Sequence, residues 1–304
     1  MQRHVPGMSP YPEAPEGWTP VARRAVGPFT THLTFRRPDG STSEWSSRTH
    51  RKHASRLSPV AAGHERFWWA PERVSWWIGV LFAVGSSCFL IAPFPGFVEL
   101  VGSGVDGMVF FVGSVFFTSA AALQCLETFN ADRGPGGGHQ RRFRLLAFEP
   151  RRIDWWSSVL QFAGTLLFNR DTFRAMQTGL EQPTYDQLVW RPDAIGSACF
   201  LVSGYLAYVE VCGGLACRPG RSLEARIAAV NLAGCVAFGI SAVAAYVVPE
   251  TGSVVDLAAA NAFTALGALC FLVGAVLLLP ESAGARDVDT RRPARQPPRR
   301  KGTF

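Results

Sequence analysis

The sequence lacks the residue patterns that indicate an enzyme or a metalloprotein. Its seven cysteines (88, 125, 199, 212, 217, 235 and 270) contain no metal-type Cys-x2-Cys pair, and its six histidines all lie outside the long apolar runs. A glycine run at 134–138 follows no strand pattern and precedes no Walker lysine, which excludes a phosphate-binding loop. We therefore expect no cofactor, no metal and no catalytic activity, and we expect the cysteines to pack as small apolar residues.

A cleavable signal peptide is also absent, because more than 60 mostly polar residues precede the first apolar run. Beyond that point, six runs are each close to the ~20 residues that a helix needs to cross a ~30 Å hydrocarbon layer. The shortest is the third, whose roughly 17 residues would cover only about 25 Å. The sequence predicts an all-α domain over residues 75–280, a bundle of six transmembrane helices at about 75–93, 107–126, 153–169, 193–213, 227–248 and 256–279.

The distribution of basic residues predicts the orientation of these spans. If all six cross the membrane and the N-terminus is cytoplasmic, 27 of the 30 Lys and Arg residues lie on the inner side, as the positive-inside rule requires. The three exceptions are Arg170, Arg174 and Arg191. We therefore expect a protein of the inner or plasma membrane with both termini in the cytoplasm.

The segments outside the bundle are polar and basic. Residues 1–74 form a cytosolic region, of which we expect residues 1–27 to be mobile and residues 29–48 to form a β-hairpin around the turn signal Pro38-Asp39-Gly40. Residues 281–304 are rich in Arg and Pro, which predicts a disordered tail. We expect these segments to contact anionic lipid headgroups. Topology already explains their charge, so we expect no nucleic-acid partner; a second copy of the chain or another membrane protein stays open as a partner.

A glycine followed four residues later by phenylalanine recurs in every predicted span. Random placement of 30 Gly and 22 Phe in 304 residues would give about two such pairs, and the chain has eight. Residues four apart share one face of a helix, and glycine lets helix backbones approach closely in a membrane. We therefore assign a helix-packing role to Gly85, Gly113, Gly164, Gly196, Gly234 and Gly267.

Part of this pattern is an internal repeat. Trp76-Trp77, Gly85 and Phe89 recur 79 residues later as Trp155-Trp156, Gly164 and Phe168. The first four spans share Gly, then Ser or Thr, then two residues, then Phe, whereas the last two have Cys235 and Ala268 at the Ser/Thr position, as expected of a diverged addition. Paired spans of this kind resemble the YrhK-like membrane domain, best seen over residues 81–89 and 110–117. That resemblance implies a helical hairpin with no assigned activity.

Polar side chains inside a membrane are costly, so they are the candidates for function. Glu210 comes first, followed by the amides Gln161, Asn231 and Asn261. Glu210 either binds a proton or cation in a water-filled cleft, or reaches the cytosolic interface beside Arg218 or Arg226.

Three functions follow from these residues. A structural or accessory membrane component is favoured, because close helix packing explains most of the unusual residues. A small-solute or proton-coupled transporter would require Glu210 and the amides to converge on a solvated cavity. A membrane enzyme would require Glu210 to share a pocket with Asn169, Arg170 or Asp171, which we expect near the opposite face.

Overall fold

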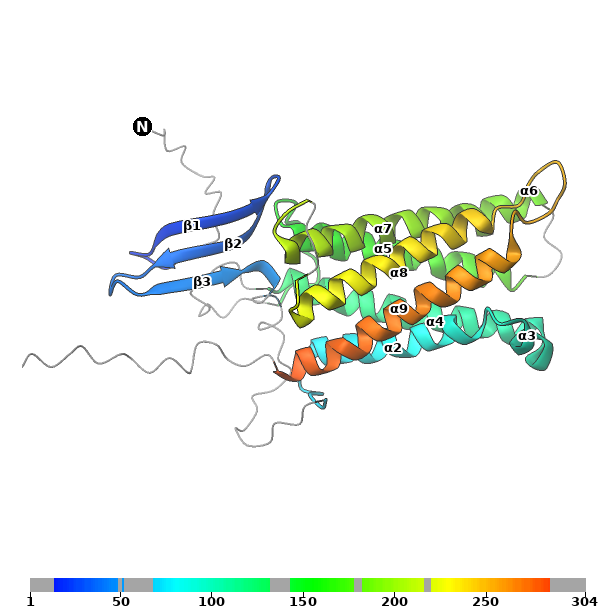
Figure 1. The fold of residues 1–304 in the computed structure, drawn as a ribbon, viewed down its shortest axis with the longest axis horizontal. Helices are drawn as coiled ribbons and strands as arrows, with labels where there is room; N and C mark the ends of the chain where they lie inside the picture. Colours follow the sequence, from blue (N-terminus) through cyan, green and yellow to red (C-terminus); the bar gives the residue numbers. More distant parts are fainter. Residues whose placement is uncertain are drawn as a thin grey trace, which may run out of the picture.

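The computed structural model describes residues 14–48, 51, 68–131, 143–177, 182–215 and 220–284. It is mostly helical, and a small antiparallel sheet lies at one end of a long helical bundle (Figure 1). The strands are β1 (Thr19–Val26), β2 (Phe29–Arg36) and β3 (Thr42–Ser46). The helices are α2 (Val74–Ile91), α3 (Pro95–Val101), α4 (Ser103–Phe129), α5 (Ile153–Ala175), α6 (Gln182–Tyr185), the π-helical turn η1 (Asp186–Trp190), α7 (Arg191–Cys212), α8 (Leu223–Ala244) and α9 (Leu257–Gly284).

Five of the described helical segments are long and apolar enough to cross a membrane: Val74–Ile91, Ser103–Phe129, Asp186–Cys212, Leu223–Ala244 and Leu257–Ala283. The length and composition of these helices make the chain a multi-pass membrane protein. The predicted span at 153–169 is not among these five helices. It is helical, but Asp154, Arg170 and Asp171 near its ends lower its hydropathy. The helix also continues to Ala175, so its 23 residues extend about 34 Å rather than 25 Å.

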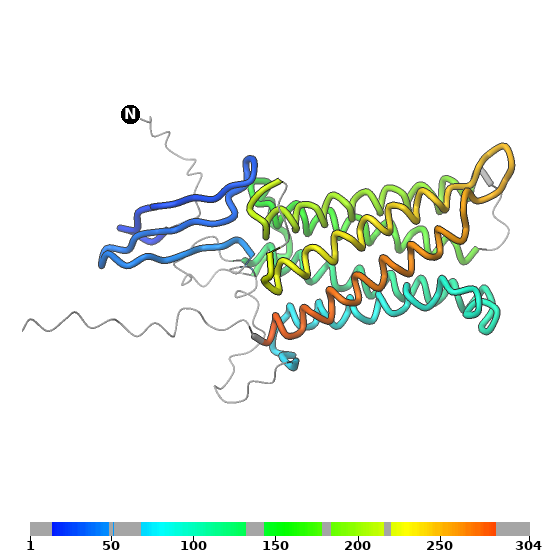
Figure 2. The backbone as a smooth tube through the Cα atoms, viewed as in Figure 1, coloured from blue at the N-terminus to red at the C-terminus, as the bar shows by residue number. Residues whose placement is uncertain are grey.

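The six long helices form three hairpins, and neighbouring hairpins pack side by side. The first hairpin is α2 with α4, the second is α5 with α7, and the third is α8 with α9. Helix α4 packs on α5, α7 on α8, and α9 returns to α2, which closes a ring. Figure 2 shows these long helices running along the same direction from the sheet to the opposite end. The last helix is longer than its apolar run predicts: residues 281–284, assigned to the tail, continue α9, and residues 285–304 lie outside the described part of the chain.

The sheet contains the predicted hairpin and one strand more. Strands β2 and β3 pair antiparallel around a turn in which Gly40, at φ 81°, donates its N–H to Arg37 O at 2.9 Å. Strand β1 pairs with the other edge of β2, so the expectation that residues 1–27 are mobile is wrong for Thr19–Val26. Only its last residue is buried, so this strand has no alternating apolar pattern from which to predict it. Residues 1–13 lie outside the described residues.

The sheet rests on the ends of α5 and α7. Val26 and the partly buried Phe29 pack against Ile153 of α5 and Val209 of α7. A second apolar cluster, of Leu33, Phe35 and Trp45, is internal to the sheet. An isolated hairpin is marginal in water, so these contacts explain how a small sheet is ordered. They also place the sheet beside one mouth of the helix ring, which we call the sheet side.

The six glycines lie where the two helices of each hairpin touch. A Cβ at Gly267 would meet Phe238 at 2.6 Å, and one at Gly164 would meet Phe200 at 2.8 Å. The contacts are reciprocal: a Cβ at Gly196 would in turn meet Phe168, and in the second and third hairpins each glycine lies against the carbonyl of the other. The third hairpin forms the same contacts although it has lost the Ser/Thr position. All three hairpins therefore share one packing motif, where the sequence had suggested only two.

The phenylalanines of these pairs meet on the axis of the ring. Phe89, Phe168 and Phe238, one from the first helix of each hairpin, form a triangle with ring centroids 6.0–6.4 Å apart. Their hairpin partners Phe117, Phe200 and Phe271 pack beneath them in the same cluster. The middle of the ring is thus filled by two aromatic layers with approximate threefold arrangement.

Candidate ligand cavity and its charged mouth

A cavity of about 110 Å³ lies inside the ring on the sheet side of the phenylalanine layers. Phe82, Phe200 and Phe271 line its apolar floor. Its walls carry three amides, several hydroxyls and one carboxylate, and two arginines lie at its mouth: Gln124, Gln161, Asn231, Ser75, Ser157, Ser203, Glu127, Arg48 and Arg51. This space exceeds the roughly 10–15 Å³ that one water molecule needs, so it has room for several waters or a small polar solute.

Three amide side chains from different helices line the cavity. Gln124 and Gln161 come from α4 and α5, and Asn231 comes from α8. Within the described residues, none of these side chains makes a hydrogen bond to another protein group. These side chains are half-buried and line the cavity, so water or a solute in it can satisfy their donors and acceptors.

Three residues that line the cavity occupy equivalent positions of the repeat. Phe82, Gln161 and Asn231 each precede the glycine of their helix by three residues, and all three line the cavity. One position of the motif is therefore aromatic in the first hairpin and an amide in the other two. The repeat supplies the shape of the cavity, and divergence at this position supplies its polarity.

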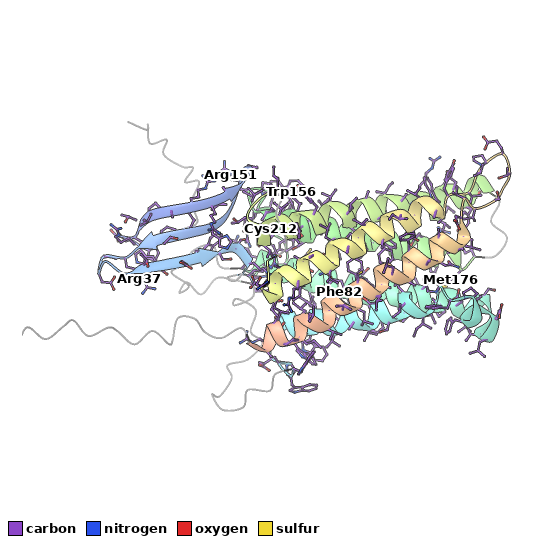
Figure 3. The ribbon with its side chains drawn as sticks, in the orientation of Figure 1. Arg37, Phe82, Arg151, Trp156, Met176 and Cys212 are labelled. Carbon is purple, nitrogen blue, oxygen red and sulfur yellow. The ribbon has the colours of Figure 1, made fainter. Side chains whose placement is uncertain are left out.

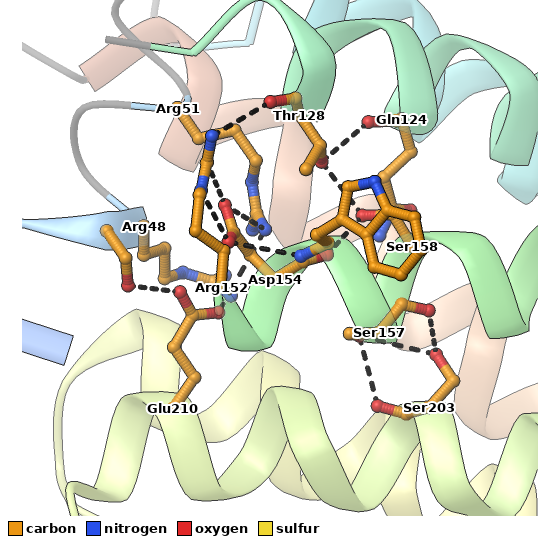
Figure 4. Close-up of polar contacts among 12 residues, drawn as sticks. Arg48, Arg51, Gln124, Thr128, Arg152, Asp154, Ser157, Ser158, Ser203 and Glu210 are labelled. Atoms are coloured by element: carbon orange, nitrogen blue, oxygen red, sulfur yellow. Dashed lines mark hydrogen bonds and ion pairs between the residues drawn. The ribbon is translucent and has the colours of Figure 1, made fainter. Parts of the chain in front are cut away.

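Glu210 lies at the charged mouth, not in the cavity wall. It is buried, accepts a hydrogen bond from Ser47, and lies 3.9 Å from Arg51 Nη1 (Figure 4). The same Arg51 nitrogen is 3.8 Å from Asp154 Oδ2 at the start of α5. One arginine from the residues that follow β3 therefore joins the carboxylates of two helices, α5 and α7.

Arg152 completes this network from the bundle itself. Its Nε donates to Asp154 Oδ1 at 3.0 Å, and Nη1 donates to Glu149 at 2.8 Å and to the carbonyl of Thr128 at 3.2 Å. Asp154 is fully buried, so its charge depends on these partners. The Arg152 side chain thus links the end of α4 to the start of α5.

Arg48 is the second arginine of the mouth and pairs with the third hairpin. Its Nη2 donates to Glu281 Oε1 at 3.2 Å, and both side chains are about nine-tenths buried. Burial alone would lower the pKa of this guanidinium, but the carboxylates of Glu281, Glu210 and Glu224 raise it above its ordinary value. Arg48 therefore stays charged and is held in place by acidic groups of the helix ring.

Of the four candidate polar residues, the structure brings three to this region. Gln161 and Asn231 line the cavity, and Glu210 contacts Arg51, which also lines it. Asn261 is on α9 but does not line the cavity. Asp171 lies near the opposite end of α5, so an enzyme pocket that combines it with Glu210 is not formed within the described residues. Arg218, expected beside Glu210, lies outside the described residues.

Sequence reasoning missed Glu127, Glu281 and both arginines. The signal for the glutamates was present: Phe117, Phe200 and Phe271 are each followed ten residues later by glutamate. Glu127 and Glu281 had been assigned to a loop and to the tail, because both lie beyond the end of an apolar run. Cys212, expected to be a packing residue, is disulfide-bonded, whereas the five other described cysteines are free. Cys212 lies at the sheet end of the bundle (Figure 3).

Among known proteins, no family model, curated protein or solved structure matches this chain. The resemblance to the YrhK-like domain therefore stays a prediction.

Proposed function

We propose that this membrane protein binds a small polar solute in the cavity and carries it across the membrane. The observation that carries this proposal is the convergence of Gln161 and Asn231, from different hairpins, on one cavity inside the helix ring. The sequence criterion for a transporter was convergence of Glu210 and the three candidate amides, and it is met in part: Glu210 lies at the mouth, and Asn261 does not line the cavity. In a purely structural bundle, the same amides would be expected to hydrogen-bond between helices, as polar residues in membranes do.

The transport proposal requires α5 to be a sixth span. Helix α5 packs between α4 and α7 and carries Gln161 into the ring, so it occupies the position of a membrane-crossing helix. With six spans, the charge distribution places the sheet and the end of α9 in the cytoplasm. The cavity then opens toward the cytoplasm, and the two phenylalanine layers form the barrier that must open for a solute to cross.

A structural or accessory role is the second candidate, supported by the reciprocal Gly–Phe contacts that make the ring rigid. Swelling of proteoliposomes in small solutes distinguishes the two functions. The transport proposal predicts that at least one of urea, glycerol, glycine and guanidinium enters faster than into protein-free vesicles. Asn231→Trp, which fills the cavity, should abolish this entry, whereas Leu266→Trp at an exposed position of α9 should not. Entry at the protein-free rate for all four solutes would favour the structural role.

A further inference from the structure

The mouth of the cavity carries one glutamate from each hairpin. Glu127, Glu210 and Glu281 follow Gly113, Gly196 and Gly267 by 14 residues each, and at about 100° per residue this spacing returns them to within roughly 40° of the glycine-bearing face. All three are buried or nearly so. The threefold motif that builds the phenylalanine layers therefore also builds an acidic ring, about 15 Å further along the helices.

Two guanidinium groups that do not belong to the helix ring lie at this acidic ring. Arg48 reaches Glu281 at 3.2 Å, and Arg51 lies 3.9 Å from Glu210. Both arginines also line the cavity, and both come from the residues directly after β3. Two cationic side chains thus lie in the mouth on the sheet side, and we refer to Arg48 and Arg51 as the plug arginines.

One of the plug arginines does not satisfy all of its hydrogen-bond donors. The Nε–H of Arg48 is buried and has no hydrogen-bond partner within the described residues, although the side chain as a whole is about nine-tenths buried. In this position the tethered Arg48 leaves at least one of its five donors unpaired within the described residues. A free guanidinium ion has no such tether, so it can orient itself to satisfy more of the carboxylate and amide oxygens.

The chemistry of the site favours an organic cation over a metal ion. Among the described residues, no three His, Cys, Asp or Glu side chains are close enough together to hold a metal. A planar cation with several N–H donors can span more widely separated acceptors, including the amides of Gln124, Gln161 and Asn231. The aromatic floor adds ring faces, to which cations are attracted.

We infer that the cavity takes a small cation of the guanidinium class, and that the plug arginines occupy the cation's place when no solute is bound. This inference rests on the proposed function, whose solute class it names. Without the plug arginines, Glu281 loses Arg48 and Glu210 loses Arg51, while Asp154 keeps Arg152. The wild-type protein should therefore bind guanidinium weakly, because the ion must first displace the plug.

Calorimetric titration of the purified protein in detergent tests this inference, with guanidinium as the probe and urea as its neutral isostere. The double variant Arg48→Ala/Arg51→Ala should bind guanidinium at least tenfold more tightly than the wild type, and urea should bind to neither. Arg36→Ala, at an exposed position of β2, is the matched control and should behave as the wild type does. Equal guanidinium affinity in the wild type and the double variant, or equal binding of urea, would overturn the inference.

Two further variants separate cavity binding from simple replacement of a missing side chain. In the double-variant background, Glu281→Gln and Asn231→Leu should each weaken guanidinium binding about tenfold, because one removes a mouth carboxylate and the other a wall amide. Unchanged affinity after Asn231→Leu would show that guanidinium merely fills the arginine positions and would overturn the cavity assignment. If the double variant does not fold, the single variant Arg48→Gln should show an intermediate gain in affinity, and no gain there would refute the plug.

Binding and transport can fail separately. Guanidinium binding without solute entry in the swelling assay would refute the proposed function. Entry of urea and guanidinium at equal rates, with no preference for the cation in the titration, would leave the transport proposal standing and overturn this inference alone.

Discussion

The middle of the helix ring and its sheet-side mouth are built from the same three hairpins but use the repeat differently. In the middle, every hairpin contributes glycine and phenylalanine at the same positions of the motif, and these residues form the two close-packed phenylalanine layers. In the cavity wall, equivalent positions have diverged to Phe82, Gln161 and Asn231. Repetition thus accounts for packing, whereas divergence from the repeat marks the site. The mouth combines both, because its three glutamates are repeated but its arginines come from outside the ring.

The largest effect is expected at the mouth, from Arg152→Ala. This change removes the guanidinium that pairs with the buried Asp154 and with Glu149, and breaking a buried ion pair costs about 3–5 kcal/mol. Unfolding in detergent with increasing denaturant would measure the loss. Arg36→Ala is the exposed control and should change the free energy of unfolding by less than about 0.5 kcal/mol. A similar, small change in both variants would show that the mouth network contributes nothing to stability.

In the middle of the ring, Gly267→Ala should destabilise by about 1–3 kcal/mol, because the new Cβ would lie 2.6 Å from Phe238. The matched control is Gly239→Ala in α8, where a Cβ would meet nothing within 4 Å. Alanine there should leave stability unchanged or raise it, since glycine weakens a helix interior. The same denaturant titration measures both variants. Equal stability of the two would contradict the account of close packing.

A smaller effect tests whether the first two hairpins are true repeats. Trp76 Nε1 donates to Trp68 O at 2.8 Å, and Trp155 Nε1 donates to Ala147 O at 2.7 Å. The second donor follows the first by 79 residues, and the second acceptor follows the first acceptor by the same number. Trp76→Phe and Trp155→Phe should therefore each cost about 0.5–1.5 kcal/mol, the net value of one hydrogen bond. Costs that differ by more than about 1 kcal/mol would indicate that the two positions have lost their equivalence.

The smallest effect concerns the sheet. Burial and the charge of Arg24 lower the pKa of His32 below its ordinary 6.5. Below pH 6.5 the unfolded chain consequently binds more protons than the folded one, so the free energy of unfolding should fall as the pH drops through this window. Thermal unfolding at pH 7.5 and 5.5 should show a larger loss in the wild type than in His32→Asn. An equal loss in both proteins would exclude His32 as the cause.

Much of the helical architecture could be predicted from the sequence, because the length of an apolar run and the charge of the adjoining loops are local features of the sequence. Strand β1 could not, since its residues are exposed and carry no apolar period. The reciprocal fit of Gly164 and Phe200 depends on the register between two helices, which periodicity within each helix does not specify. Glu281 was missed because α9 continues past Pro280 and the end of its apolar run. The partner of Glu210 was missed because Arg51 is 159 positions away in the chain.

Thiol labelling tests the central claim, a polar cavity open toward the sheet side, most directly. In a background without native cysteines, Asn231→Cys and Asn261→Cys place thiols at two amide positions within the helices, of which only the first lines the cavity. In oriented membrane vesicles, a small maleimide added on the side of the sheet should modify the Asn231→Cys protein at least tenfold faster than the Asn261→Cys protein. Equal rates, or faster labelling of Asn231→Cys from the opposite side, would contradict the account.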